Sequence, residues 1–500
     1  MNIFKITAFS ALCLLFFSNQ CIKVSAVSPL TGTTEERIAA QQSMTIESNE
    51  VENWPEGPVV SAEAAILMEA GTGAILYSKN IHEKEYPAST TKILTTLIAS
   101  EESSLDEIVT FSDTAVFGIP RDSNNIAMNT GDTLTMEECL NAILIRSANE
   151  VSIAVAEHIA GSAEDFAVMM NERAAELGCV DSNFVNPNGL PDENHYTSAY
   201  DLAMIGRAFF SNEMLCKMTM SPMLIIQKPS GEYRDANQMK LLPGKEYEYS
   251  YLVGCKTGYT DAARSTLVSC AEKDGLKLIC VVMRDENPEY YEDTISLFDY
   301  GFANFSKVNI SETETKYNID NSGAFYSDND IFGSSKPILS LNEDDYIVLP
   351  KTADFSDTVS TISYDTDNEN QVALITYTYH DVFIGYASVD LAVSEGSAYS
   401  FDTISETEAE EALTEEPSFV FINIFKLLLY IAAIAAIIFL ISGIIYVFKN
   451  YNFSARSTRR SWRLQQLRRR IPFKSGALRS ARRRRNLAKR SRRSHKKGSH

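Results

Sequence analysis

The sequence predicts an α/β domain, then a small all-β domain and one transmembrane helix. Three observations lead to this fold class. Strand-like and helix-like stretches alternate from residue 59 to residue 305. From 308 to 393, short β-branched and aromatic runs lie between clusters of Asp, Asn, Ser and Gly. Residues 427–448 are 22 consecutive residues without a charge, enough to cross about 30 Å of hydrocarbon as a helix.

Charge is divided unevenly along the chain. The 500 residues carry a net charge of −21, from 45 Lys and Arg against 66 Asp and Glu. Residues 449–500 hold 20 of these cations and no acid, which leaves 25 cations and all 66 acids for the rest. A basic segment directly after an apolar span stays in the cytoplasm, so we expect the acidic body outside. The tail could also suit nucleic acid, but its position directly after the span favours an orientation signal, with additional affinity for anionic lipid headgroups, and we expect no nucleic-acid partner.

The N-terminal residues have the pattern of a secretory signal peptide. Lys5 precedes a mostly apolar run over residues 6–17, and Val24-Ser25-Ala26 places small residues at the −3 and −1 positions of a cleavage site. We therefore expect cleavage after Ala26; an uncleaved anchor is the alternative, although the apolar run is too short to span a bilayer. Six cysteines in the remaining chain do not form a disulfide framework, and scattered His and Cys residues predict no metal site.

Within the α/β region, local patterns identify two elements. Residues 64–68 and 74–77 are strand-like and flank Gly71-Thr72-Gly73, which predicts a hairpin. Thr135 and Glu138 form a capping box that opens a helix. The whole chain divides into a signal peptide (1–26), a polar tether (27–58), the α/β domain (59–305), the all-β domain (308–393), an acidic stalk (394–418), a transmembrane segment (419–448) and a basic cytoplasmic tail (449–500).

The pattern Ser-x-x-Lys occurs twice, at Ser89/Lys92 and at Ser494/Lys497, and only the first has a predicted fold around it. Ser89 follows Tyr86-Pro87-Ala88 and starts an apolar-periodic helix. Side chains at i and i+3 share a helix face, so the Lys92 amine can reach the Ser89 hydroxyl. The N–H groups of a first helical turn have no helical partner and can bind an anion. One turn of chain therefore offers a nucleophile, a base and an oxyanion donor.

Two further motifs follow in chain order. Ser-x-Asn occurs several times, and Ser147-Ala148-Asn149 is the copy at the end of the capped helix. Lys256-Thr257-Gly258 occurs once, at the end of a strand-like run that Tyr259 continues. On a strand edge Lys256 supplies charge, Thr257 donates a hydrogen bond and Gly258 allows a close backbone approach, which together suit a carboxylate.

Joined in this order, the motifs resemble those of the D-alanyl-D-alanine carboxypeptidase family of low-molecular-mass penicillin-binding proteins, serine peptidases with a β-lactamase-like fold. Residues 87–92, residues 186–190 with His195, and residues 256–260 are similar to family segments. The resemblance covers about residues 59–305 and implies an α/β catalytic domain of the β-lactamase/DD-peptidase type, in which helices flank an antiparallel sheet beside a helical subdomain. The sequence departs from many members at Ala263-Arg264, where they have Ala-Gly, and in its full spanning helix with a basic tail.

The resemblance implies a serine-type carboxypeptidase that removes the terminal D-Ala from peptidoglycan stem peptides, with β-lactam antibiotics as inhibitors and no cofactor. The uncharged span and the basic tail, in turn, predict a single-pass protein of the cell membrane, with both folded domains outside the cytoplasm and lipid contacts through the span and the tail. Ser89 would be the nucleophile, Lys92 its base and Ser147 a proton relay. The residues that the resemblance assigns to the site are Ser89, Lys92, Ser147 and Asn149 for catalysis, and Lys256, Thr257, Gly258 and Tyr259 for substrate binding.

Three other functions share parts of this pattern. A class A β-lactamase uses a glutamate-activated water for deacylation, but residues 183–190 contain no Glu. A non-catalytic wall-binding protein could retain the fold, although the intact motifs argue against it. A transpeptidase with an amine acceptor is compatible with the same three motifs.

His195 is expected to be structural, because a Ser-Lys site needs no histidine and no Asp partner can be assigned.

Overall fold

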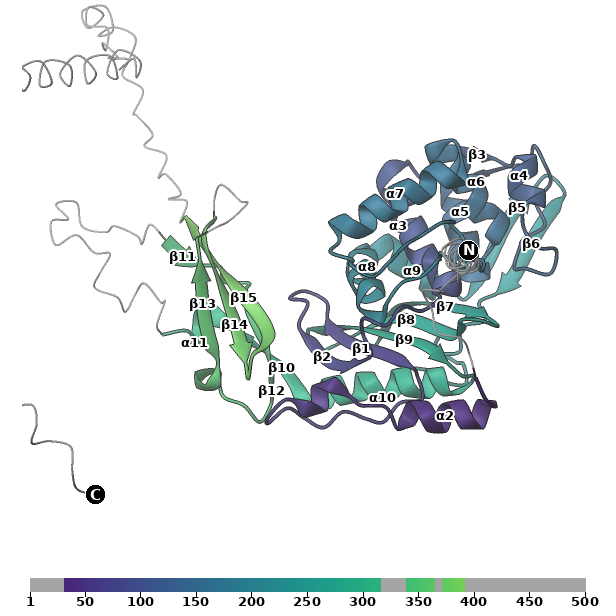
Figure 1. The fold of residues 1–500 in the computed structure, drawn as a ribbon. Coiled ribbons are helices and arrows are strands. Elements are labelled where there is room, and N and C mark those ends of the chain that lie inside the picture. The colour runs from purple at the N-terminus through teal and green to yellow at the C-terminus, as the bar shows by residue number, and fades with distance from the viewer. Residues whose placement is uncertain (1–30, 316–338, 365–370, 392–500) are drawn as a thin grey trace, which may run out of the picture. The chain divides into compact units, whose positions relative to one another are not determined.

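The computed structural model describes residues 31–315, 339–364 and 371–391. At its centre is a five-stranded antiparallel sheet in the order β2-β1-β9-β8-β7, covered by helices on both faces (Figure 1). This agrees with the predicted sheet flanked by helices, and the expected hairpin is β1-β2. The strands are β1 (Ala64–Glu69), β2 (Ile75–Lys79), β7 (Leu252–Thr260), β8 (Arg264–Lys273) and β9 (Leu276–Asp285).

The central sheet separates two hydrophobic cores. Along β9, Ile279 and Val281 face the first core, whereas Leu278 and Cys280 face the second. This alternation follows from the two-residue period of a strand. Because both faces are covered, β1 and the middle of β9 are continuous apolar runs rather than alternating ones.

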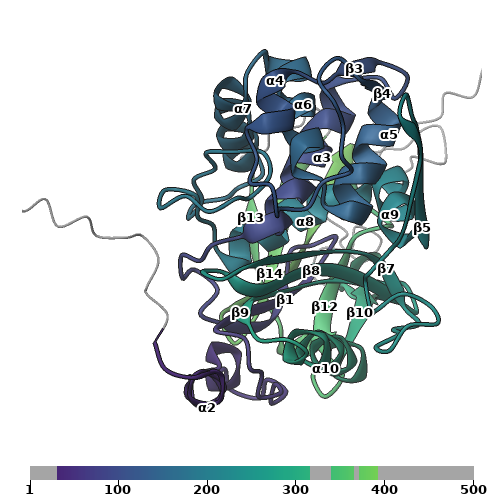
Figure 2. The ribbon, with the colours of Figure 1, turned by 90° about the vertical axis from the view of Figure 1, so that its right-hand side faces the viewer.

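The first core lies under a helical subdomain. Helix α8 packs across β1, β8 and β9, while α3 lies between α8, α6 and α7. Figure 2 shows these helices on one side of the sheet and α10 with α2 on the other. The elements on this side are α3 (Lys92–Glu102), β3 (Ile108–Thr110), α4 (Asp113–Phe117), β4 (Thr133–Thr135), α5 (Met136–Asn141), α6 (Asn149–Ala160), α7 (Ala163–Glu176), α8 (Ala199–Ser211), α9 (Glu213–Met220), β5 (Met223–Lys228) and β6 (Gly231–Ala236).

The second core continues from the central sheet into a second sheet. Helix α10 (Glu289–Asn304) covers the central sheet, and its end leads directly into β10 (Phe305–Asn309). Ile347 and Leu349 of the second sheet belong to the same core as Leu297 of α10. This sheet has the order β10-β12-β15-β14-β13, with β11 paired to β15. Its elements after β10 are α11 (Ile310–Thr313), β11 (Leu339–Leu341), β12 (Tyr346–Pro350), η5 (Phe355–Asp357), β13 (Val359–Ser363), β14 (Gln371–Tyr379) and β15 (Val382–Leu391).

Part of the segment expected to be a polar tether is folded. It contains helix α2 (Thr34–Gln42) and the 3₁₀ turn η1 (Glu47–Glu50). Thr33 caps α2 through a complete capping box with Glu36. Trp54 is buried in the second core. The tether prediction is therefore wrong for these residues, because long-range packing orders a stretch that shows no apolar period.

Several predicted segments fall outside the described residues. They are the signal peptide, the acidic stalk, the transmembrane segment and the basic tail. Among the residues that the structure does describe, no helix has both the length and the apolar character to cross a bilayer.

Candidate active site

The predicted nucleophile lies in a tight turn at the start of α3. Residues Ala88–Thr91 form the 3₁₀ turn η2, which leads into the helix. Ala88 has a φ of +48°, a region that L-residues rarely adopt. The Thr91 hydroxyl donates to the Ala88 carbonyl at 2.8 Å. This turn places Ser89 Oγ 2.9 Å from Lys92 Nζ.

Three oxygen atoms surround the amine of Lys92, which is wholly buried. Besides Ser89 Oγ, they are Asn149 Oδ1, at 2.7 Å, and the backbone carbonyl of Asn188. The last two can only accept hydrogen bonds. In its neutral form the amine has two N–H groups and one lone pair, so these two acceptors would take both N–H groups and the lone pair would be directed at the Ser89 hydroxyl.

Burial and electrostatics favour this neutral form. Burial, and then the positive charge of Lys256, lower the pKa of Lys92 well below its usual value; Glu150 opposes them. Glu150 was not found by sequence reasoning. It is buried beside Asn149 and accepts a hydrogen bond from the backbone N–H of Ile126 at 2.6 Å.

The second motif follows a break in its helix. The capping box of Thr135 and Glu138 opens α5, as predicted, and a π-helical turn, η3 (Ala142–Arg146), then ends it. Ser147 follows with a φ of +60°. Asn149 begins α6. The strained backbone at Ser147 thus lets both polar side chains of this motif face the same site.

Lys256 approaches from the central sheet. It lies on β7, and its buried Nζ lies 3.3 Å from Ser147 Oγ and 2.7 Å from the Thr257 carbonyl. Burial lowers the pKa of Lys256 to about 8. Near neutral pH this lysine is therefore predominantly charged, and its charge is one of the two causes that lower the pKa of Lys92.

Two glycines allow these segments to meet. A Cβ on Gly258 would lie 2.8 Å from the Ser89 backbone nitrogen and 2.5 Å from Thr266 Oγ1. A Cβ on Gly189 would collide with the Ala88 carbonyl. Both positions need a backbone without a side chain, because η2 is held between β7 and the loop that carries Asn188.

All three motifs contribute to one open pocket of about 740 Å³. Lys92 lies beneath its floor, and Lys256 borders a smaller hollow of about 220 Å³ that shares Ser147 and Thr257 with it. Of the predicted site residues, those that line the main pocket are Ser89, Ser147, Asn149, Thr257, Gly258 and Tyr259. Its other lining residues are Thr34, Asp122, Ser123, Asn124, Gly189, Leu190, Thr260, Arg264, Ser265, Glu286, Asn287 and Tyr290.

His195 contacts the nucleophile turn η2 directly, through Thr91. Its Nδ1 accepts from the backbone N–H of Val185 at 3.1 Å, which leaves the proton on Nε2. Nε2 is 2.8 Å from Thr91 Oγ1, and Thr91 in turn donates to Ala88. Burial lowers the pKa of His195 to about 4. The neutral ring therefore supports the turn and does not face Ser89.

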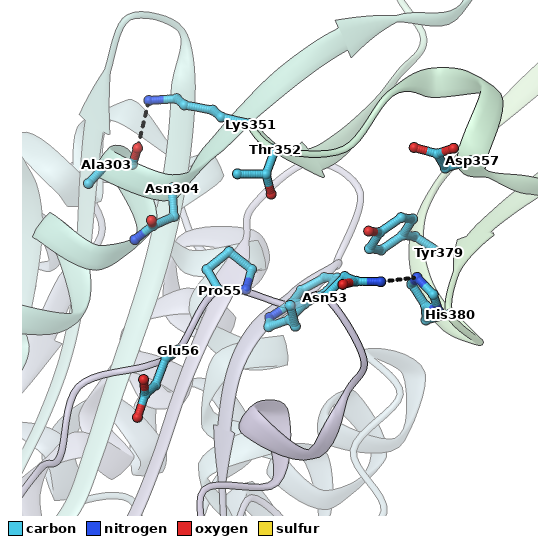
Figure 3. Close-up of a pocket in the computed structure, with 11 residues that line it drawn as sticks. Asn53, Pro55, Glu56, Ala303, Asn304, Lys351, Thr352, Asp357, Tyr379 and His380 are labelled. Carbon is cyan, nitrogen blue, oxygen red and sulfur yellow. Dashed lines mark hydrogen bonds between the residues drawn. The ribbon is translucent and has the colours of Figure 1, made fainter.

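A hollow larger than the main pocket lies elsewhere. It measures about 940 Å³ and lies between residues 53–56 and the second sheet (Figure 3). Lys351 donates to the Ala303 carbonyl at 3.0 Å, and Asn53 Nδ2 lies 3.5 Å from His380 Nε2. The residues that line this hollow include no hydroxyl beside a buried amine. Volume alone therefore does not identify the reaction site.

Comparison with known proteins points to one family. A family model described as D-alanyl-D-alanine carboxypeptidase matches residues 51–287. The chain is 33% identical over 255 residues to DacF of Bacillus subtilis, covering 49% of this chain and 63% of the relative, which is less than two thirds of its length. It is 31% identical to DacB2 of Mycobacterium tuberculosis, covering 50% of this chain and 84% of that one.

Solved structures extend the similarity into the second sheet. PBP3 of Streptococcus pneumoniae, described as a peptidoglycan synthesis regulatory factor, has a TM-score of 0.55 and 27% identity, covering 66% of this chain and 99% of its own. Penicillin-binding protein 5 of Haemophilus influenzae has a TM-score of 0.54 at 24% identity, covering 67% and 98%. The two-domain architecture is therefore the fold of these proteins.

The buried position of His195 predicts a pH-dependent contribution to stability. Its pKa is about 4 in the folded chain and about 6.5 when unfolded, so the unfolded chain binds the extra proton between these values. This contribution is complete above pH 6.5 and falls by roughly 3 kcal/mol as the pH drops to 4. The free energy of unfolding, measured with urea between pH 4.5 and 7, should lose this part of its pH dependence in His195→Gln. If the free energy of unfolding changed equally steeply with pH in the wild-type protein and in His195→Gln, this would contradict a neutral buried imidazole.

Proposed function

Since the chain belongs to the D-alanyl-D-alanine carboxypeptidase family, we propose that it is a serine-type carboxypeptidase that removes the terminal D-Ala from peptidoglycan stem peptides through an acyl-enzyme on Ser89. The observation that carries this proposal is the buried Lys92 amine, whose Nζ lies 2.9 Å from Ser89 Oγ and beside two further acceptor oxygens; once neutral, the amine can accept the proton of the Ser89 hydroxyl. Such a pair is a nucleophile with its base already in place.

In the acylation step, Ser89 Oγ attacks the carbonyl carbon of the penultimate residue and Lys92 accepts the serine proton. The backbone N–H groups of Ser89 and Tyr259 form the oxyanion hole in this proposal; one such donor typically contributes about 3 kcal/mol to lowering the barrier. The close approach of Gly258 to the Ser89 nitrogen supports this pairing of β7 with η2. The C–N bond then breaks, and D-Ala leaves as an amine.

The leaving amine needs a proton, and Ser147 supplies the route for it. Its hydroxyl is 3.3 Å from Lys256 Nζ and lines the pocket. Asn149 holds the Lys92 amine through its Oδ1. Lys256 and Thr257 bind the terminal carboxylate by charge and by a hydroxyl hydrogen bond. Water then attacks the acyl-enzyme, with Lys92 again as base, and releases the shortened peptide.

A β-lactam would be attacked by the same hydroxyl. When the β-lactam ring opens, the amine stays attached to the acyl group and cannot leave. The acyl-enzyme would therefore persist, and penicillin should act as an inhibitor that is released slowly. The β-lactamase alternative has less support, because the relatives found are carboxypeptidases and the loop from 183 to 190 offers no carboxylate to activate water.

The protein would work at the outer face of the cell membrane. Support comes from the sequence alone: an uncharged run of 22 residues over 427–448, followed by 20 cations without an acid. The span would anchor the acidic folded domains outside, next to the wall, and the basic tail would contact anionic lipid headgroups from the cytoplasm.

Ser89→Ala should abolish both fluorescent penicillin labelling and D-Ala release from muropeptides, measured by mass spectrometry, because within the described part of the chain Ser89 supplies the hydroxyl that lies at 2.9 Å from the Lys92 amine. Ser494→Ala is the matched control, since it removes the other Ser-x-x-Lys serine, and it should change neither. Penicillin labelling that survives in Ser89→Ala would refute the assignment of the nucleophile.

The two lysines predict that kcat/KM rises with pH on the acidic side of its profile and falls on the alkaline side. As pH rises, kcat/KM should first increase as Lys92 loses its proton, then decrease near pH 8 as Lys256 loses the charge that binds the carboxylate. Lys256→Arg keeps its charge at every accessible pH. Its residual kcat/KM should therefore show no alkaline limb. An unchanged decrease near pH 8 in this variant would assign that limb to another group.

The membrane topology can be tested on intact cells. Protease added outside should digest the folded domains and spare an epitope placed after residue 500, because the tail is expected in the cytoplasm. The same epitope should disappear once the cells are permeabilised. Digestion of the epitope in intact cells would contradict the proposed orientation.

A further inference from the structure

Arg264 has a strained backbone at the rim of the active-site pocket. It is the first residue of β8 and has a φ of +54°. This region favours glycine, the residue that many family members have at this position. A non-glycine residue persists there when its surroundings hold it, and such strain often coincides with a functional role.

The surroundings that hold Arg264 are a buried carboxylate and a second arginine. Glu286, whose side chain is 3% exposed, accepts from Arg264 Nη2 at 2.6 Å and from Arg37 Nη2 at 2.6 Å. Burial alone would raise the pKa of Glu286, but the two guanidinium groups outweigh it and keep the pKa below its usual value. Two cations share one anion, so this triad carries a net charge of +1.

Part of the Arg264 guanidinium remains available to a ligand. Its Nε and Nη2 donate to Glu286, and its Nη1 donates to the Tyr259 hydroxyl at 3.1 Å. These contacts use three of the five guanidinium N–H groups. The other two have no partner among the described residues, and Arg264 lines the pocket together with Tyr259 and Glu286.

The order of residues along β7 places Arg264 on a definite side of the nucleophile. Gly258 packs against the Ser89 nitrogen. Lys256 and Thr257 precede this point and, in the proposed function, bind the terminal carboxylate. Tyr259 and Thr260 follow it, and Thr260 pairs with Arg264 across the strands. The part of the peptide upstream of the scissile bond therefore extends toward Arg264.

We propose that Arg264 determines specificity by binding a carboxylate on the acyl-donor part of the stem peptide, upstream of the scissile bond. Arg37 is a positioning residue in this proposal: it shares Glu286 with Arg264 and so leaves the pair with a net positive charge. The inference rests on the proposed function and names a feature of its substrate. It also gives helix α2, from the segment expected to be a tether, a part in substrate recognition.

The test uses two synthetic donor peptides that end in D-Ala-D-Ala. They differ only in the residue before this dipeptide, whose side chain ends in a carboxylate in one and in a carboxamide in the other. Wild-type protein should hydrolyse the carboxylate donor with a kcat/KM about tenfold higher, mainly through a lower KM, as one charge-assisted hydrogen bond permits. In Arg264→Gln this ratio should fall to about 1, while kcat on the carboxamide donor is retained.

Three further variants separate recognition from folding. Arg264→Gly suits the positive φ and should fold normally, yet lose the discrimination. Arg37→Gln should raise KM severalfold for the carboxylate donor alone. Arg234→Gln, on the exposed β6 hairpin and paired with Glu232, makes the same change of charge away from the pocket and should keep the full ratio.

Equal kcat/KM values for the two donors in wild type, or a ratio that survives in Arg264→Gln, would overturn the inference while D-Ala release continues. If the wild-type protein hydrolyses neither donor, the proposed function itself fails. The two failures are thus distinguished by whether the carboxamide donor is cleaved.

Discussion

The site depends on one buried amine whose surroundings oppose a positive charge. Lys92 is enclosed under the pocket with two oxygen acceptors and one hydroxyl. An ammonium there would lose most of its hydration, and the charge of Lys256 opposes it further. Since Asn149 and the Asn188 carbonyl take the two N–H groups, the lone pair has one direction left. Loop, helix and sheet are each required to keep this arrangement, which explains why three distant parts of the chain converge on one side chain.

Left-handed backbone conformations, which L-residues rarely adopt, help to bring these parts together. Ala88, Ser147 and Arg264 all have positive φ values, and each lies at the pocket or next to it. Gly189 and Gly258 permit contacts that a Cβ would prevent. The rest of the fold supplies the stability that this strain requires, through two cores on either side of a sheet. Strained backbone is thus one of the means by which this pocket is assembled, although positive φ values also occur at other non-glycine residues of the described chain.

The sequence predicted the parts of this structure that depend on local chemistry. The β1-β2 hairpin, the capping box of α5 and the helix after Ser89 follow from turn residues, caps and apolar period, and the family follows from the motifs. Helix α2 was missed, although Thr33 and Glu36 form a capping box. A nine-residue polar helix is marginally stable alone, and this one is held by the ion pair between Arg37 and Glu286. The Asn188 carbonyl was missed because a backbone group leaves no signal in the side-chain pattern. Arg264 was noticed only as a departure, and its role depends on partners far apart in the chain.

The protonation state of Lys92 is the most direct test of this account. NMR of protein labelled with ¹³C at the lysine Cε atoms can follow the titration of each amine, and Lys92→Met identifies the resonance of Lys92. We predict that this resonance is that of a neutral amine at pH 7 and that it titrates far below the exposed lysines. A Lys92 resonance that stays in the charged form up to pH 10 would contradict the account, because the hydroxyl of Ser89 would then have no base beside it.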